Sequence, residues 1–191
     1  MRRILVLGEH HLIAQRLFKQ LQACSNVQVS MLTTSQLHDH QKLPQILAPF
    51  DTWASFLGPH DVDLAFEALF TASDVSQPPL KQILMLSTAG IDHEVIHGQL
   101  KYAGINNLKE YFNEQRYAIK LIDESEIPYT ILRPVNITTE QSSSPLQIIE
   151  EGHLVPVGSV SVDNIVKLSE KILLQPAYLN QSIALVEKRG K

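Results

Sequence analysis

The chain begins with an apolar run that has the length of a buried strand. Residues 4–7 contain no polar side chain, which is typical of a parallel strand covered on both faces. Gly8 ends the run, and apolar residues then recur at helical spacing, at Leu12, Ile13, Leu17, Phe18 and Leu21. The pattern predicts a strand, a turn and an amphipathic helix that starts near His10 or His11 and ends before Ser25.

Strand and helix patterns then alternate along the rest of the chain. Strands are predicted at residues 27–32, 51–58, 82–91, 129–134 and 182–186. Helices are predicted over 61–71, capped by Asp61, over 107–126, and in a C-terminal segment capped by Ser161 or Asp163. Residues 36–49 are interrupted by Pro44 and are too few for a helix and a further strand. The predicted fold class is α/β, a doubly wound parallel sheet whose third strand is missing or vestigial.

Composition narrows the class of protein. The 191 residues, 44% of them hydrophobic, suit one α/β domain over residues 1–191. A net charge of -4, without a basic cluster, argues against a nucleic-acid partner. No apolar run is long enough to span a membrane, and Met1 leads almost directly into a core strand, so we expect a cytoplasmic protein. The lone Cys24 excludes an internal disulfide framework.

The turn after the first strand resembles that of the NAD(P)-binding Rossmann proteins of the extended and atypical short-chain dehydrogenase/reductase type, the NmrA-like and NAD(P)H-binding group. Their turn usually reads Gly-x-x-Gly-x-x-Gly. Here Gly8 holds the first place, His11 the second and Ala14 the third. The resemblance implies a pyrophosphate at the helix N-terminus. The residues it places there are Gly8, His10, His11, Leu12 and Ala14.

Two later stretches carry the same resemblance more closely. One strand ends in Ser87-Thr88-Ala89-Gly90, and residues 129–134 read Tyr-Thr-Ile-Leu-Arg-Pro, both similar to family strands. The resemblance implies a cofactor pocket lined by Gly58, Ser87, Thr88, Arg133 and Pro134. A purely structural ion pair between Arg133 and a strand-end carboxylate is an equal alternative.

The choice between NAD and NADP stays open. At the end of the second strand the family places an arginine for the 2'-phosphate of NADP, or an acidic residue for the ribose of NAD. This chain has Thr33 and Thr34 there, which form hydrogen bonds but carry no charge. Thr33 is the predicted ribose contact. Because a histidine stands at the middle glycine place, retention of the cofactor is open as well.

The family's catalytic pair, Tyr-x-x-x-Lys, is incomplete. Tyr111 falls at the tyrosine place, but Gln115 stands where the lysine is expected. A neutral amide does not stabilise a phenolate, so we expect the pKa of Tyr111 to lie near its ordinary value of about 10. Tyr117 with Lys120 is a substitute in another register. The candidate catalytic residues are Ser87 and Tyr111.

Three functions remain for this sequence. The first is an NAD(P)H-dependent reductase or isomerase of a small carbonyl or conjugated substrate. The second is a non-catalytic dinucleotide or metabolite sensor, as among NmrA-like proteins. The third is a zinc hydrolase, because residues 93–97 read His93-Glu94-Val95-Ile96-His97, the H-E-x-x-H motif. A homodimer is the default assembly.

Overall fold

The computed structural model describes residues 1–96, 100–102, 104–140 and 144–187. Its strands are β1 (Arg2–Leu7), β2 (Val27–Leu32), β3 (Thr52–Ser55), β4 (Gln82–Leu86), β5 (Val95–Ile96), β6 (Tyr129–Pro134), β7 (Asn136–Thr138), β8 (Leu146–Ile149), β9 (Val155–Pro156), β10 (Ser159–Ser161) and β11 (Gln181–Glu187). Its helices are α1 (Leu12–Gln22), α2 (Thr34–Leu37), α3 (Leu43–Leu47), α4 (Val62–Ser76), α5 (Leu108–Glu124) and α6 (Val162–Leu174).

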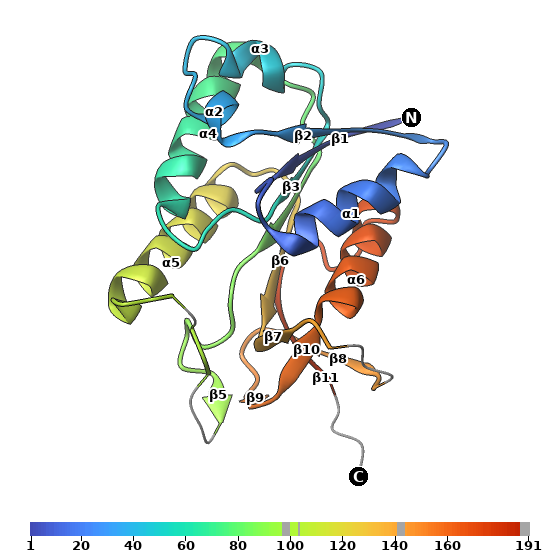
Figure 1. The fold of residues 1–191 in the computed structure, drawn as a ribbon. Helices are drawn as coiled ribbons and strands as arrows, with labels where there is room; N and C mark the ends of the chain where they lie inside the picture. The colour runs from blue at the N-terminus through green and yellow to red at the C-terminus, as the bar shows by residue number, and fades with distance from the viewer. Residues whose placement is uncertain (97–99, 103, 141–143, 188–191) are drawn as a thin grey trace.

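A seven-stranded sheet forms the centre of the molecule (Figure 1). Its order is β2-β1-β3-β4-β6-β11-β8, and every pairing is parallel except that of β8 with β11. Helices α1 and α6 pack together on one face, whereas α3, α4 and α5 cover the other (Figure 1). The predicted α/β class with a mostly parallel sheet is confirmed.

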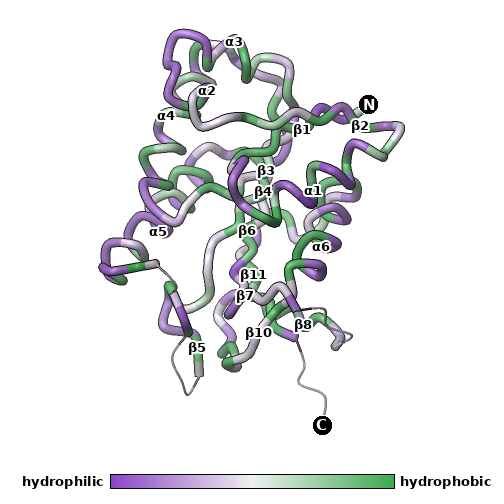
Figure 2. The backbone as a smooth tube through the Cα atoms, viewed as in Figure 1, coloured by the Kyte–Doolittle hydropathy of each residue, from purple (hydrophilic) through white to green (hydrophobic). Residues whose placement is uncertain are grey.

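Alternation along β1 explains why both faces are covered. Ile4 and Val6 point into the core shared with α1 and α6, while Leu5 and Leu7 point into the core shared with α3, α4 and α5. All four side chains are buried, because successive residues of a strand face opposite sides of the sheet. Figure 2 shows the hydrophobic residues along the central strands and the helix faces turned toward them.

The expectation of a missing third strand is also confirmed. Within the described residues, β2 pairs only with β1 and is the edge of the sheet. The chain from β2 to β3 forms only the short helices α2 and α3, and Pro44 lies in the first turn of α3. From β1 the chain continues to β2, which pairs with one side of β1, and then to β3, which pairs with its other side. This reversal marks the sheet edge where ligands bind in doubly wound folds.

The prediction for the helix after β3 was wrong in two respects. It continues to Ser76 and not to residue 71, and Asp61 stands at its N-cap position without a capping side-chain hydrogen bond. The backbone of Asp61 is left-handed, with φ of 56°. This is not the extended conformation from which a side chain caps a helix. Its backbone N–H donates instead to Glu114 Oε2 of α5, at 2.9 Å.

Candidate functional site

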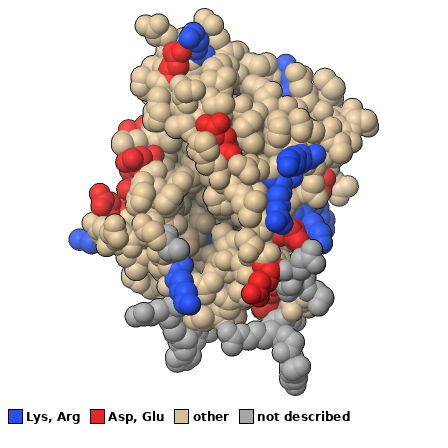
Figure 3. All heavy atoms as spheres, in the orientation of Figure 1, with Lys and Arg blue, Asp and Glu red and all other residues tan. Residues whose placement is uncertain are grey.

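A cleft of about 360 Å³ lies at the carboxyl ends of the parallel strands. Segments after β1, β3, β4 and β6 form its walls, together with α5 and the chain before it. Six of the predicted site residues line it: His11, Gly58, Ser87, Thr88, Tyr111 and Pro134. The face drawn in Figure 3 is hollowed near its middle, and the walls of this hollow carry few charged side chains.

The other predicted residues are not part of the cleft lining: Gly8, His10, Leu12, Ala14, Thr33 and Arg133. Ala14 lies on the buried face of α1 and is fully buried. Arg133 is 2% exposed, and its NH1 group donates to Asp92 Oδ2 at 2.7 Å and to Glu94 Oε1 at 3.2 Å. The structural ion pair, which the sequence left as an alternative, is therefore formed.

His11 occupies the start of α1. Its backbone N–H donates to the Gly8 carbonyl at 2.9 Å, which closes the turn. Its Nδ1 accepts from the backbone N–H of Ile13 at 3.2 Å, and its ring stacks on Phe56 with centroids 6.1 Å apart. Burial lowers the pKa of His11, so the ring stays neutral and keeps a lone pair for this cap. The imidazole thus accepts a hydrogen bond from the Ile13 N–H, a group that could otherwise donate to a phosphate.

This cap leads to a test of the turn. We expect His11→Gly to tighten the binding of NADH and NADPH, because it frees the Ile13 N–H and removes a ring beside the backbone. Glycine is itself a fair N-cap, so loss of the cap costs only a few tenths of a kcal/mol. Loss of the ring that stacks on Phe56 adds to this cost. The measurement is a nucleotide fluorescence titration, with His11→Asn as the control because asparagine also caps. Unchanged or weaker binding to His11→Gly would show that the histidine is neutral or contacts the ligand.

Two residues of the cleft lining each have a buried polar atom without a hydrogen-bond partner among the described residues. These atoms are Ser87 Oγ and Gln115 Oε1, and their residues are 7% and 2% exposed. A buried polar atom without a hydrogen bond costs about 1–3 kcal/mol. Such atoms are therefore usually satisfied by a ligand or by ordered water.

Tyr111 reaches the same cleft from the first turn of α5. Asn107 caps this helix, because its side chain accepts from the Glu110 backbone N–H. Burial raises the pKa of Tyr111, and a side-chain hydrogen bond with Thr88 opposes part of the change. The expectation of an ordinary pKa was wrong, since it considered only the missing lysine and not the burial of the phenol. The Tyr111 phenol is therefore neutral at physiological pH.

The segment before α5 supplies cleft residues that the sequence analysis missed. Leu100, Lys101, Tyr102 and Ile105 line the cleft. The Tyr102 hydroxyl donates to the Ala89 carbonyl at 2.9 Å, and burial raises its pKa to about 12. No periodic pattern marks this segment, because its position depends on contacts with the loop after β4.

The zinc motif does not form a helix where the structure describes it. His93 lies in a turn with φ of 60° and Val95–Ile96 form β5, whereas His97 lies outside the described residues. Glu94 is buried and accepts from the backbone N–H groups of Gly90 and Asp92, in addition to Arg133. The described residues contain no group of three side chains able to hold a metal ion. The helical arrangement on which the hydrolase interpretation depends is thus not formed.

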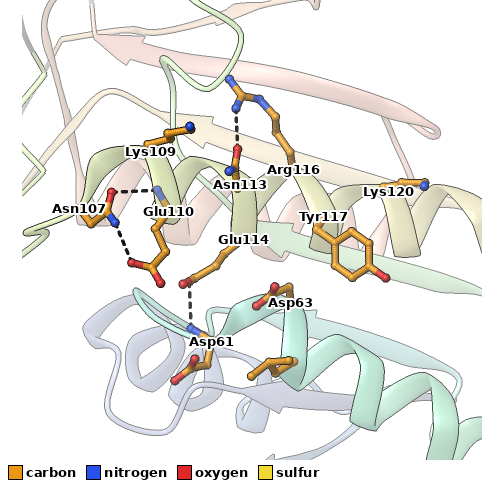
Figure 4. Close-up of a pocket in the computed structure, with 11 residues that line it drawn as sticks. Asp61, Asp63, Asn107, Lys109, Glu110, Asn113, Glu114, Arg116, Tyr117 and Lys120 are labelled. Atoms are coloured by element: carbon orange, nitrogen blue, oxygen red, sulfur yellow. Dashed lines mark hydrogen bonds between the residues drawn. The ribbon is translucent and has the colours of Figure 1, made fainter.

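A second hollow, separate from the cleft, lies between the start of α4 and helix α5 (Figure 4). Its carboxylates include Asp61 and Asp63 of the α4 start and Glu110 and Glu114 of α5. Several of its polar groups bond to one another, as Asn107 does to Glu110 and Asp61 to Glu114 (Figure 4). In contrast to the cleft, it has no buried polar atom without a partner among the described residues.

The order of the strands, the turn into α1 and the cleft at the switch point define a dinucleotide-binding Rossmann fold. A family model described as NAD(P)H-binding matches residues 6–176. The chain therefore belongs to this NAD(P)H-binding family, and NAD(P) is the cofactor class of its domain.

Solved structures share the fold. A wide-type short-chain dehydrogenase/reductase from Veillonella parvula, in complex with NADP, has a TM-score of 0.79 and 20% identity, covering 98% of this chain and 95% of its own. A Rossmann-fold NAD(P)-binding family protein from Shigella flexneri has a TM-score of 0.75 and 20% identity, covering 100% and 96%. The anaerobillin reductase ChuY from Escherichia coli O157:H7 has a TM-score of 0.75 and 16% identity, covering 99% and 98%. Among curated proteins, none matches this chain.

The residues present fit a dinucleotide in two respects and oppose it in one. Ser87 and Gln115 offer buried polar atoms that lack partners, and a Cβ at Gly58 would meet no atom within 4 Å, so the backbone there is open to a ligand. The His11 side chain, by contrast, occupies the Ile13 N–H. Separately, none of the described helices is long and apolar enough to cross a membrane.

Proposed function

We propose that this protein is an NAD(P)H-dependent reductase, or a related isomerase, that acts on a small carbonyl or conjugated substrate in the cleft. The observation that carries the proposal is the convergence of the Tyr111 phenol with the unpartnered Ser87 Oγ and Gln115 Oε1 in one cleft at the switch point of the sheet. Family membership supplies the cofactor class, and this cluster supplies groups that hold a substrate oxygen.

The geometry favours reduction, with Tyr111 as an acid. When bound in the cleft, NAD(P)H would supply the hydride for the substrate carbon. A phenol is protonated at neutral pH, and burial raises the pKa of Tyr111 further, so its O–H donates a hydrogen bond to the substrate oxygen. As the carbon–oxygen π bond breaks, the electron pair goes to that oxygen, which takes the Tyr111 proton. Water then returns a proton to the phenolate.

Two neighbouring residues orient the substrate in this mechanism. Ser87 Oγ donates a second hydrogen bond to the developing oxyanion. Gln115 lies one turn from Tyr111 on α5 and lines the same cleft, where its amide would orient the substrate. Its neutral charge does not stabilise the phenolate, so we expect slow turnover.

Substitution of Tyr111 tests the proposal. We expect Tyr111→Phe to lower kcat by about 100-fold or more, the usual contribution of a positioned acid, while the Kd for nucleotide stays within threefold. The measurement is NADH and NADPH oxidation with a panel of aldehydes, quinones and conjugated enones. Tyr117→Phe is the control, because Tyr117 lies on the same helix but is exposed outside the cleft. Equal activity of wild type and Tyr111→Phe would contradict the role of the phenol.

A non-catalytic dinucleotide sensor is the second candidate. The observation that favours it is the buried Gln115 in the lysine place, which leaves Tyr111 without a neighbouring cation on its helix. Nucleotide binding with no turnover across the substrate panel would support the sensor and reject the reductase.

A further inference from the structure

The turn after β1 carries a carboxylate to the end of β2. The two strands are parallel, with Leu7 beside Leu32, so the residues that follow each strand emerge next to one another. Glu9 Oε1 accepts from the backbone N–H of Thr34 at 2.7 Å, across 25 positions of sequence. A single side chain therefore links the glycine turn to the first residue of α2.

Several contacts hold this carboxylate in place. The Gln15 side chain donates to the Glu9 carbonyl at 2.8 Å and fixes the backbone of the turn. Thr33 forms a capping box with Gln36, which fixes the chain around Thr34. The hydrogen bond from Thr34 lowers the pKa of Glu9, so the carboxylate is ionised at neutral pH. A hydrogen bond from the Thr34 side chain adds to this lowering of the pKa. The Glu9 side chain is a quarter exposed, so the carboxylate stays open to a ligand.

Little positive charge balances Glu9. The segment after β2 reads Thr33-Thr34-Ser35, without lysine or arginine. The nearest ionisable partner is the exposed His10, whose Nε2 lies 3.6 Å from Glu9 Oε1. Arg16 of α1 is engaged elsewhere, in an ion pair with Asp163 at 2.5 Å.

In doubly wound dinucleotide domains the adenosine ribose lies at this corner, where an acid accepts from its 2'-hydroxyl or an arginine receives the 2'-phosphate. Here the end of β2 supplies neither charge, and the glycine turn supplies the acid. We propose that Glu9 makes this protein select NAD(H) against NADP(H). The inference rests on the proposed function, since it requires a nucleotide in the cleft. The ionised, partly exposed Glu9 carboxylate accepts from the ribose hydroxyl, whereas a 2'-phosphate would place about two negative charges beside it.

The test compares NADH and NADPH on wild type and on Glu9→Gln by fluorescence titration at low salt. Wild type is expected to bind NADH at least tenfold more tightly than NADPH. Glu9→Gln should reduce this ratio at least fivefold, mainly by tightening NADPH, because the amide oxygen still accepts from Thr34 while the charge is gone. Thermal unfolding without nucleotide checks that the turn is retained.

Glu124→Gln is the matched control, since it removes the same charge at the last residue of α5. This residue precedes β6 and therefore lies near the amino ends of the strands, away from the cleft. Its ion pair with Lys120 is exposed and contributes little. Its NADH to NADPH ratio should equal that of wild type. Equal affinities in wild type, or a parallel loss of both nucleotides in Glu9→Gln, would overturn the inference and leave the reductase proposal standing. If wild type bound neither nucleotide up to millimolar concentration, both proposals would fall together.

Discussion

Replacing Arg133 by methionine is expected to lower the free energy of unfolding by about 3–5 kcal/mol, the usual cost of removing one partner from a buried ion pair. Arg133 is 2% exposed and reaches Glu94, which is 8% exposed. Without the guanidinium, the Glu94 carboxylate keeps only its two backbone donors, from Gly90 and Asp92, and no cation. The expected result therefore comes from a buried, uncompensated charge and less from lost packing, because methionine retains much of the apolar volume.

Urea denaturation at neutral pH measures this change. Asp92→Asn is the control, because the Asp92 side chain is about half exposed and its loss leaves the Arg133–Glu94 contact intact; a loss of no more than about 1 kcal/mol is expected. Combining Arg133→Met with Glu94→Gln should recover part of the stability, since the charge left unpaired is then removed.

The same variant distinguishes the two interpretations of Arg133. A structural ion pair predicts a large stability loss with nucleotide affinity changed little in the protein that remains folded. A cofactor contact predicts the reverse, a loss of nucleotide affinity with stability within about 1 kcal/mol of wild type. The latter outcome would contradict the ion pair as the main role of this arginine.

The sequence predicted the central strands well because most of their residues are buried. The predicted strands at Val27–Leu32 and Tyr129–Pro134 match β2 and β6 residue for residue. The first was indicated by its alternation of apolar and polar residues, and the second by its resemblance to a family strand. The shortage of residues between β2 and β3 likewise predicted the missing strand, because chain length limits what can form there. The end of α4 was less predictable: the helix continues through Ala72 and Val75 to Ser76, beyond the expected stop near residue 71.

The site was predictable only where it follows directly from a strand end. Ser87, Thr88 and Pro134 lie in the cleft because each closely follows or ends a parallel strand. The contact of Glu9 with Thr34 depends on the register of two strands, and the contact of Arg133 with Glu94 depends on how the loop after β4 folds back. Local patterns contain neither fact. Glu94 is an example. Its sequence context indicates a zinc motif, but in the structure it accepts hydrogen bonds from a turn of the backbone and from Arg133.

Substitution of Gly8 by alanine is expected to destabilise the protein by about 3 kcal/mol or more, the combined cost of strain at positive φ and of overpacking. Gly8 has φ of +97°, and a Cβ there would overlap the carbonyl oxygen of Phe56 and lie 2.7 Å from its carbonyl carbon. These are backbone atoms of the chain leaving β3, and the Phe56 N–H donates to the Leu7 carbonyl at 3.0 Å. The strand pairing therefore cannot relax without breaking a hydrogen bond.

Gly152→Ala separates the two causes, because Gly152 also has a positive φ, +82°, but a Cβ there would meet no atom within 4 Å. Its expected cost is the strain alone, about 1 kcal/mol. Chemical denaturation of both variants measures the difference, which is the part due to the close approach of the turn to Phe56. Equal losses in the two variants would mean that the approach is not tight, and Gly8 would then be kept for its φ or for a ligand. A larger loss at Gly8 would show that this glycine is needed for the pairing of β1 with β3 before any cofactor binds.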